Sequence, residues 1–453
     1  MSNGGLGVGL LMGARTAGAA LALALAAAVS LGMARFSYAL LLGPMRADLH
    51  WTYFTAGLMN TANACGYLVG ALLMAPLLRR CDARAAMLCG GAAAAVLLAL
   101  HGSTRSDTAL LLLRAACGIA SAVSFVGGGV LAARLASQSP GRAGQVLGLY
   151  YGGTGVGIVA SALVVPPWVQ ADPGGWALAW WLLGGLSLLA TAATALGTRA
   201  LRAPPKPGAP RTRLLLAPFA WGLAGYLMFG LGYIGYMTFI VTLLREQGLT
   251  RGAITAFYVV LGLGVVASSW LWAGLLQRHR GGRPLATLNA LLALATALPV
   301  WSAHPVAVFV SGALFGSVFL SVVASTTALV RHNALAAQWP PGIAAFTVVF
   351  AAGQIVGPGL TGAIADGPGG LLRGLGHRVR TGGNLGVPPW DPEVEQDVDW
   401  WVVETSSYQA TDVTTGPPVV VVTSLSQDHL DWHGGADRYY RDKLSLCTRP
   451  GVR

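Results

Sequence analysis

Two arginines within apolar stretches are the residues best placed to do chemistry. Arg35 is the one charge in residues 17–42, and Arg114 lies early in the apolar run of residues 108–136. Placing an arginine inside a membrane helix costs roughly 3 kcal/mol or more, so each needs a physical reason. Either side chain could snorkel to the nearer membrane surface. Alternatively, both could face a polar cavity, where two cations would favour the anionic group of a small-molecule substrate.

Aromatic residues in neighbouring apolar runs are further candidates for a substrate pathway, although packing and interfacial roles are more common. No Asp or Glu lies well inside an apolar run, and Glu246 stands at the end of one. Because proton-coupled carriers usually use an intramembrane carboxylate or histidine, the sequence does not predict a coupling ion. The aromatic candidates are Tyr38, Tyr150, Tyr151, Trp180, Trp181, Tyr233 and Tyr236.

The stretches that must position these residues are membrane helices. The 453-residue chain is 54% hydrophobic and only 10% charged, which excludes an ordinary soluble protein. Backbone groups in lipid must bond within their own segment, so apolar runs of this length are expected to be helices. Eleven spans are predicted, at residues 17–42, 53–78, 85–102, 108–136, 144–168, 174–198, 215–244, 253–276, 284–302, 305–330 and 342–365.

The charges between the spans alternate from one side of the membrane to the other. Fifteen Arg or Lys fall on the side that holds Arg15, and four fall on the side that holds Arg46. Because basic loops stay in the cytoplasm, we predict a multi-pass protein of the cell inner (plasma) membrane with a cytoplasmic N-terminus. This topology explains the net charge of +12, so no nucleic-acid partner is expected.

An internal repeat divides the spans into two groups. Residues 32–36 align with 232–236, and residues 153–157 align with 353–357. An offset near 200 residues indicates duplication of a six-helix unit, as in transporters whose halves move about a central site. The proline-rich, basic stretch 200–213 between the groups is the predicted cytoplasmic linker.

The repeat also predicts the domain organisation. Residues 1–199 are a six-helix bundle, and residues 214–365 are a second bundle of five helices. A twelfth span belongs near residues 373–399, but that window is too polar to cross lipid. Residues 366–370 are therefore the expected junction with a different kind of segment.

Glycines at spacings of four put small residues on one face of a helix. Their expected role is close helix packing, which is also what a moving gate requires. Pro358 would add a kink or hinge. The glycines are Gly148, Gly152, Gly153 and Gly157 in the fifth span and Gly353 and Gly357 in the eleventh.

Residues 1–365 resemble the major facilitator superfamily. Residues 114–118, RAACG, are similar to its fourth-helix arginine motif, and residues 148–157 to its antiporter motif without the proline. Residues 32–45, GMARFSYALLLGPM, look most like the YbfB/YjiJ branch. The family's basic loop between helices two and three has its counterpart at Arg79, Arg80, Asp82 and Arg84.

This resemblance implies an all-α polytopic membrane protein of two bundles, a secondary transporter that works by alternating access on a small solute. It also implies that the first helix faces the central cavity. Because the repeat places Gly235 opposite Arg35, that charge belongs to one half only. A cavity-facing Arg35 is therefore favoured over snorkelling, and the transporter is expected to be a monomer in the lipid bilayer.

Residues 371–453 have a different chemistry. Two β-branched runs, at 400–408 and 417–426, are typical of buried strands, and residues 437–446 of a helix. This amounts to a short, incomplete α/β fragment. His429 and His433 could share a helix face as metal ligands, but a solvated loop is the simpler explanation and no metal site is predicted.

Four ordered motifs of the tail resemble the central domain of a Mur ligase, nearest to the enzyme that adds D-glutamate to UDP-N-acetylmuramoyl-L-alanine. The resemblance implies that Glu404 and His429 help to place magnesium, that Asn384 lies by the substrate, and that Lys443 is the modified active-site lysine. Ser424 stands where the family usually has asparagine. The motifs are residues 381–388, 402–409, 421–434 and 439–446.

Ligase activity is not expected, because the family binds ATP through a G-K-[ST] loop and the sequence has no Gly-Lys pair. Magnesium and ATP would be cofactors only if the fragment were part of an intact ligase. Two alternatives to transport therefore stand: a Mur ligase-type enzyme, and a non-transporting membrane protein from a chimeric or truncated gene.

Overall fold

The computed structural model of the chain describes residues 5–139, 142–171, 173–201, 215–335, 338–374, 377–383, 398–422 and 430–452. Eleven helices among these residues are long and apolar enough to cross a membrane, as predicted from the sequence. Ten of them and most of the eleventh belong to a compact unit of residues 1–362, and residues 363–453 form a second unit.

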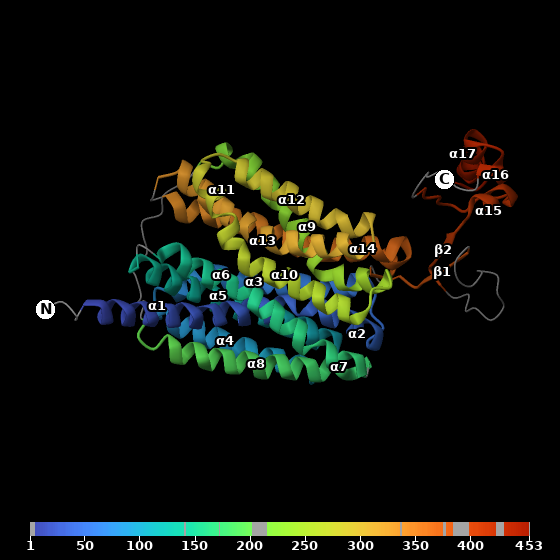
Figure 1. Cartoon of the computed structure of the whole chain (residues 1–453). Helices are drawn as coiled ribbons and strands as arrows, with labels where there is room; N and C mark the ends of the chain where they lie inside the picture. The colour runs from blue at the N-terminus through green and yellow to red at the C-terminus, as the bar shows by residue number, and fades with distance from the viewer. Residues whose placement is uncertain are drawn as a thin grey trace. The chain divides into compact units, whose positions relative to one another are not determined.

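The first six spans lie side by side (Figure 1). The helix α5 packs against α3 and α4, and α4 packs against α8. Side chains of Thr52, Asp82 and Ser106 cap the N-termini of α3, α4 and α5. The elements are α1 (Gly5–Ala27), the π-helix η1 (Ala28–Phe36), α2 (Tyr38–Asp48), α3 (Tyr53–Leu77), α4 (Ala83–His101), α5 (Asp107–Ser137), α6 (Ala143–Val164), α7 (Pro166–Ala171), η3 (Pro173–Gly175) and α8 (Trp176–Gly197).

The next five spans form the second bundle, in which α13 packs between α10 and α12. Its last helix is interrupted at Gly367, whose φ of 66° is a left-handed conformation that glycine adopts readily. The interruption falls within the predicted junction at 366–370. The elements are η4 (Ala217–Phe219), α9 (Ala220–Glu246), α10 (Arg251–Leu271), α11 (Ala273–Arg278), α12 (Arg283–Trp301), α13 (Pro305–Asn333) and α14 (Trp339–Gly374).

The first span differs from the uninterrupted α-helix that the sequence predicts. All nine residues of η1 are buried, and its end is marked by Ser37, whose hydroxyl donates to the carbonyl of Met33 at 2.5 Å. Wider i→i+5 turns of this kind occur frequently at functional sites. The segment contains Arg35, so the irregular backbone lies at the first candidate residue.

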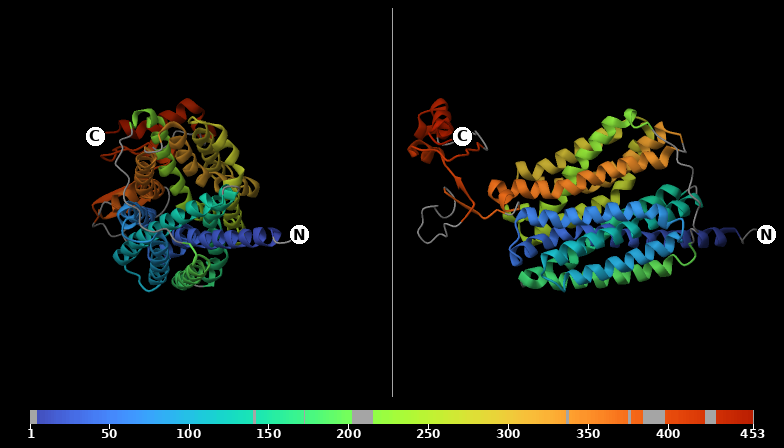
Figure 2. Two further views of the ribbon diagram at one scale, coloured as in Figure 1. Left: turned by 90° about the vertical axis from the view of Figure 1, so that its left-hand side faces the viewer. Right: turned by 180° about the vertical axis from the view of Figure 1, so that it is seen from behind.

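The two ends of the bundles differ in charge. We call the end that carries Arg79, Arg84 and Arg278 the basic end, and the end that carries Arg46 and Glu246 the opposite end. The bundles approach each other at the opposite end and separate toward the basic end (Figures 1 and 2). The hydroxyl of Tyr53 donates there to the Glu246 carboxylate, across the two bundles.

Glycines let the helices approach closely. A Cβ on Gly153 would stand 2.0 Å from the Ala24 carbonyl oxygen, and one on Gly157 would stand 2.3 Å from that of Ala28. Gly353 and Gly357 lie in the same way against Leu227 and Leu231 of α9. The equivalent helices of the two halves therefore pack through equivalent glycines.

Other glycines of α6 face the second bundle. A Cβ on Gly148 would stand 3.2 Å from the Ser269 Cβ, and one on Gly152 would stand 3.4 Å from the Val266 carbonyl oxygen. Gly57 of α3 lies against the carbonyl of Pro358, where a Cβ would stand at 2.3 Å. Two seams of small residues, α6 on α10 and α3 on α14, thus join the bundles.

Replacing Gly157 by leucine is expected to destabilise the first bundle by about 1–3 kcal/mol or more, because no space exists beside the Ala28 backbone. The unfolding temperature in detergent and the monodisperse fraction on size exclusion would both fall. Gly144→Leu in the same helix is the matched control, since nothing lies within 4 Å of a Cβ at that position. Equal stability of the two variants would contradict this packing.

The second unit is small. The strands β1 (Val379–Gly383) and β2 (Trp400–Glu404) are parallel, with Val379 opposite Trp400. Arg378 hydrogen-bonds Asp399 at 2.9 Å just before the strands pair, and these bonds hold the pKa of that carboxyl below its usual value. The helices that follow are α15 (Ser407–Asp412), α16 (Leu430–His433), α17 (Ala436–Leu444) and the 3-10 turn η6 (Ser445–Thr448).

One predicted strand is wrong within the described residues. Residues 417–422 of the β-branched run 417–426 form no strand, and Val419, Val421 and Val422 are exposed. A strand needs a neighbour for its backbone groups, and the described sheet has two strands that pair with each other. Residues 423–426 lie outside the described part of the chain.

Candidate functional site

Arg114 is fully engaged in bonds between the helices of the first bundle. Its Nε donates to the Met59 carbonyl at 3.3 Å, Nη1 to the Ala34 carbonyl at 3.2 Å, and Nη2 to Asn60 Oδ1 at 2.6 Å. The guanidinium also lies 4.7 Å from the ring centroid of Tyr38. Because every guanidinium nitrogen has a partner, Arg114 joins α5 to α3 and to η1.

The Arg114 network extends to the second bundle. Asn60, which accepts from Arg114, donates through Nδ2 to Thr238 Oγ1 on α9 at 2.7 Å. Tyr258 of α10 donates to the Phe36 carbonyl at 2.6 Å, beside the end of η1. Carbonyl groups around the helix break thus accept hydrogen bonds from both bundles.

Arg35 is buried but differently placed. Its side chain is 4% exposed, and Nη2 has no hydrogen-bond partner among the described residues. The guanidinium lies 5.4 Å from the ring centroid of Tyr67 on α3. Electrostatic interactions link it to Tyr67 and to Tyr233 on α9 of the second bundle. Arg35 is therefore a buried cation between residues of both bundles, with donor capacity left over.

Aromatic residues of the second bundle also lie in the region of Arg35. Tyr233 stacks on Phe319 at 5.9 Å and accepts a hydrogen bond from Gln354. Phe319 also meets Phe36 edge-on at 5.7 Å, next to Arg35 in the chain. Rings of the two bundles thus meet beside Arg35 in the chain.

The other aromatic candidates are spread over the two bundles. Tyr38 is buried and donates to the Ala56 carbonyl at 2.9 Å, and Tyr150 is buried and donates to that of Phe125. Tyr236 shares a hydrogen bond of 2.7 Å with Ser311. Trp180 is buried against His101, whereas Tyr151 and Trp181 are exposed. Among the described residues, no hydrogen bond or ring contact joins Tyr38, Tyr150 or Tyr236 to Arg35.

The loop motif at the basic end ties two helices together. Asp82 accepts from the Arg84 backbone N–H at 2.8 Å, as the N-cap of α4. The Arg84 side chain reaches α8, donating to Thr198 Oγ1 at 3.2 Å and to the Ala195 carbonyl at 2.7 Å. Arg79 and Arg80 are exposed.

Sequence reasoning missed several polar residues that complete this region. Asn60 and Asn63 lie three apart on α3, and both bond groups of Arg114, Asn63 through the Arg114 carbonyl at 3.1 Å. Two amides on one face of an apolar helix were a signal that could have been used. Gln354 and Tyr258 carry no comparable pattern, because each is a single polar side chain among apolar neighbours.

The ligase-like residues are only partly placed. Asn384 and His429 lie outside the described residues. Glu404 is exposed at the end of β2, and Lys443 donates to the Tyr439 hydroxyl at 2.8 Å. Among the described residues, no bond joins Glu404 to Lys443, and no group of three or more His, Cys, Asp or Glu is arranged to hold a metal ion. The two described residues, Glu404 and Lys443, do not form a magnesium site by themselves.

His433 has a clear structural environment. Its Nδ1 lies 2.7 Å from the Asp442 carboxylate and its Nε2 lies 3.0 Å from the Ser407 hydroxyl. The order carboxylate, imidazole, hydroxyl is that of a nucleophilic triad. However, His433 and Ser407 are both buried. Because the imidazole and the hydroxyl are buried, we interpret the three groups as a structural link between α15, α16 and α17.

Comparison with known families gives two matches. A family model described as "Uncharacterised MFS-type transporter YbfB" matches residues 27–376, and one described as "Mur ligase middle domain" matches residues 367–451. Both resemblances predicted from the sequence are thereby confirmed.

Solved structures agree on the fold. A bacterial homologue of the human lysosomal transporter Spinster, in an inward-facing and unoccupied conformation, superposes with a TM-score of 0.60 and 16% identity, over 80% of this chain and 85% of that chain. The nucleoside transporter NupG superposes with a TM-score of 0.57 and 14% identity, over 78% and 91%. At these identities the likeness concerns the fold alone.

Curated relatives named UDP-N-acetylmuramoyl-L-alanine–L-glutamate ligases match the C-terminal part of the chain. The protein of Xylella fastidiosa is 43% identical over 88 residues, which cover 18% of this chain and 19% of that protein. The protein of Micromonospora sp. is 55% identical over 67 residues, which cover 15% and 14%. The chain thus spans a fifth or less of these relatives, whose names specify L-glutamate where the sequence resemblance suggested D-glutamate.

Proposed function

Because the chain belongs to the family of uncharacterised MFS-type transporters of the YbfB kind, we propose that it moves a small anionic solute across the membrane. The solute's anionic group would bind Arg35 between the two bundles, and transport would proceed by alternating access. The fold and the membrane location follow from the family, whereas the charge of the solute is the new element.

The observation that carries this proposal is the buried Nη2 of Arg35, which has no hydrogen-bond partner among the described residues. A buried charge without a partner is expensive, and protein interiors normally neutralise it or bond all its donors. Arg114 donates to the carbonyl of Ala34, the residue before Arg35, and all three of its guanidinium nitrogens have partners. The fold is therefore able to satisfy the hydrogen bonds of a buried arginine. A carboxylate or phosphate on the solute would accept charge-assisted hydrogen bonds from Arg35 and so occupy its unused donor.

Alternating access is supported by the arrangement of contacts between the bundles. The Tyr53–Glu246 bond joins the bundles at the opposite end. A Cβ on Gly362 of α14 would stand 2.3 Å from the Tyr53 carbonyl, at the same end. With the basic end in the cytoplasm of a cell inner membrane, as positive-inside topology suggests, this state would open inward. Gly148, Gly152 and Pro358 lie on the seams where the bundles would slide.

The test is uptake by proteoliposomes that contain the purified full chain as a monomer. Vesicles preloaded with one solute class at a time, carboxylates, phosphorylated sugars, neutral sugars or amines, are diluted into the labelled solute. Saturable counterflow of an anionic class is the expected result. Flux of a neutral or cationic class alone would overturn the anionic assignment, and no flux of any class would favour the non-transporting alternative.

The Mur-ligase-like segment is proposed to have no ligase activity of its own. Its matched stretch corresponds to 19% of the Xylella protein, and its described residues do not complete a magnesium site. Magnesium and ATP would matter only to an intact ligase. ATP-dependent glutamate ligation by the purified chain would overturn this proposal without bearing on transport.

A further inference from the structure

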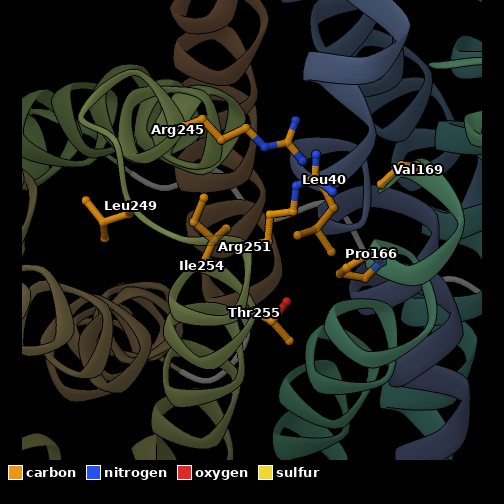
Figure 3. A pocket seen from close by; sticks show the side chains of 8 residues that line it. All are labelled: Leu40, Pro166, Val169, Arg245, Leu249, Arg251, Ile254 and Thr255. Atoms are coloured by element: carbon orange, nitrogen blue, oxygen red, sulfur yellow. The ribbon is translucent and has the colours of Figure 1, made fainter. Parts of the chain in front are cut away.

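A pocket separate from Arg35 lies where α9 ends and α10 begins, at the opposite end (Figure 3). Its volume is about 280 Å³. Residues of both bundles line it, so a molecule inside it would touch both halves. The lining residues are Leu40, Pro166, Val169, Arg245, Leu249, Arg251, Ile254 and Thr255.

Two arginines point into this pocket from the two sides of the turn between α9 and α10. Figure 3 shows the side chains of Arg245 and Arg251 directed toward Leu40 of the first bundle. The charge of Arg251 acts on Arg245. Among the described residues, the lining contains no Asp or Glu and neither arginine forms an ion pair. Two neighbouring cations with no counter-charge among the described residues attract an anion, although both side chains are partly open to solvent.

Gly43 shapes the pocket from the side of the first bundle. A Cβ on Gly43 would stand 2.5 Å from Nη1 of Arg245. The guanidinium therefore lies directly on the backbone of α2, across the interface between the bundles. The missing side chain of Gly43 is what admits Arg245 into this position.

The helix that starts beside the pocket adds to the positive potential. Arg251 is the first residue of the 21-residue α10, and Thr250 caps it by accepting from the Ala253 N–H at 3.3 Å. The N-terminus of a long helix attracts anions through its free N–H groups and its dipole. The arginine pair and the helix end thus act on the same pocket.

We propose that this pocket binds a phosphate group, held by Arg245 and Arg251 and bridging the two bundles at the opposite end. A volume at the lower limit of ordinary ligand pockets suits a phosphate with a small attached group. The site goes beyond the proposed transport function, because it lies apart from Arg35 and is defined by binding alone. Its occupant is either a free phosphate compound or the phosphate of a lipid head group.

The experiment is calorimetric titration of the full chain in detergent with inorganic phosphate, in an Arg35→Met background that removes the other proposed anion site. One phosphate per chain is expected to bind. Arg245→Gln together with Arg251→Gln should weaken this binding at least tenfold. Arg278→Gln together with Arg280→Gln is the matched control, which removes two exposed arginines near the other end of α10 and should leave binding unchanged.

A second variant keeps both arginines. Gly43→Leu should displace Arg245 and weaken phosphate binding, with the unfolding temperature recorded to confirm a folded protein. Absence of saturable binding in the Arg35→Met protein, or equal binding by the arginine pair variant and its control, would overturn the site. Transport measurements are not needed for either outcome, so failure here is distinct from failure of the proposed function.

The source of the phosphate follows from a comparison of nanodiscs of phosphatidylcholine with nanodiscs that also contain phosphatidylglycerol. Weaker binding of inorganic phosphate in the second kind would assign the occupant to the lipid, provided the arginine pair variant abolishes the difference. Equal binding in both would assign it to a free phosphate compound. A lipid effect that persists in the arginine pair variant would place the lipid elsewhere and contradict the lipid assignment.

Discussion

Replacing Arg35 by methionine is expected to abolish anion flux while leaving the protein as stable as the wild type or more stable. Removal of a buried charge whose hydrogen bonds are incomplete relieves a desolvation penalty that exceeds the contact with the Tyr67 ring. The same change removes the proposed partner of the solute, and loss of one member of a buried charge pair costs roughly 2–5 kcal/mol. Flux should therefore fall about 30-fold or more, since each 1.4 kcal/mol is a factor of ten.

Two quantities are measured for each variant: the initial rate of counterflow in proteoliposomes and the unfolding temperature in detergent. Arg35→Lys keeps the charge and should retain part of the flux, whereas Arg35→Met should not. A structural Arg35 would behave differently: methionine would lower the unfolding temperature and lysine would not restore flux. Full flux in a well-expressed Arg35→Met protein would contradict a role in solute binding and would favour a packing or snorkelling role for Arg35.

Replacing Arg114 is expected to have the opposite effect, a loss of folded protein. Three bonds to Met59, Ala34 and Asn60 connect the helices, and interhelical hydrogen bonds in membrane proteins contribute about 0.6–1.7 kcal/mol each. Arg114→Met should thus cost roughly 2–5 kcal/mol. At about 2–4 °C per kcal/mol, the unfolding temperature should fall by roughly 4–20 °C.

Arg114→Lys should be nearly as damaging, because one ammonium group is unable to reach three acceptors that a planar guanidinium bonds at once. The matched control is Arg105→Met, which removes an exposed arginine from a surface pair with Asp48 at 3.2 Å. Exposed pairs contribute little, so its stability should stay within about 1 kcal/mol of the wild type. An Arg114→Met protein as stable as this control would show that the network is dispensable.

The number of spans and the position of each could be predicted from the sequence, because apolar length and loop charge act locally. The pairing of equivalent glycines was also foreseen as close packing, although their partners on α1 and α9 were not. The contrast in hydrogen bonding between Arg35 and Arg114 could not be predicted from the sequence. Both are arginines in apolar helices, and their difference depends on Asn60 and on carbonyl groups that tertiary structure brings near one of them.

The helix break and the tail show a second limit. Residues 28–36 have an ordinary apolar helical composition, so nothing in their pattern distinguishes a π-helix from an α-helix. In the tail, the run 417–426 has the composition of a strand, but strand formation depends on a partner that composition does not supply. Side-chain pattern predicts an element's tendency, whereas its neighbours decide its geometry.

The π-helix also affects how this transporter is compared with others. An α-helix turns 100° per residue, whereas a π-helix holds more residues in each turn and so rotates less per residue. From residue 28 onward, each side chain therefore points in a different direction from the one it would have in a regular α-helix. A helical wheel drawn through residues 17–42 therefore assigns Arg35 to the wrong face. An alignment with a relative whose first helix is regular should therefore place a gap within residues 28–36. Without that gap, Arg35 is compared with a residue at a different place on the helix, and an equivalent arginine would be scored as lost.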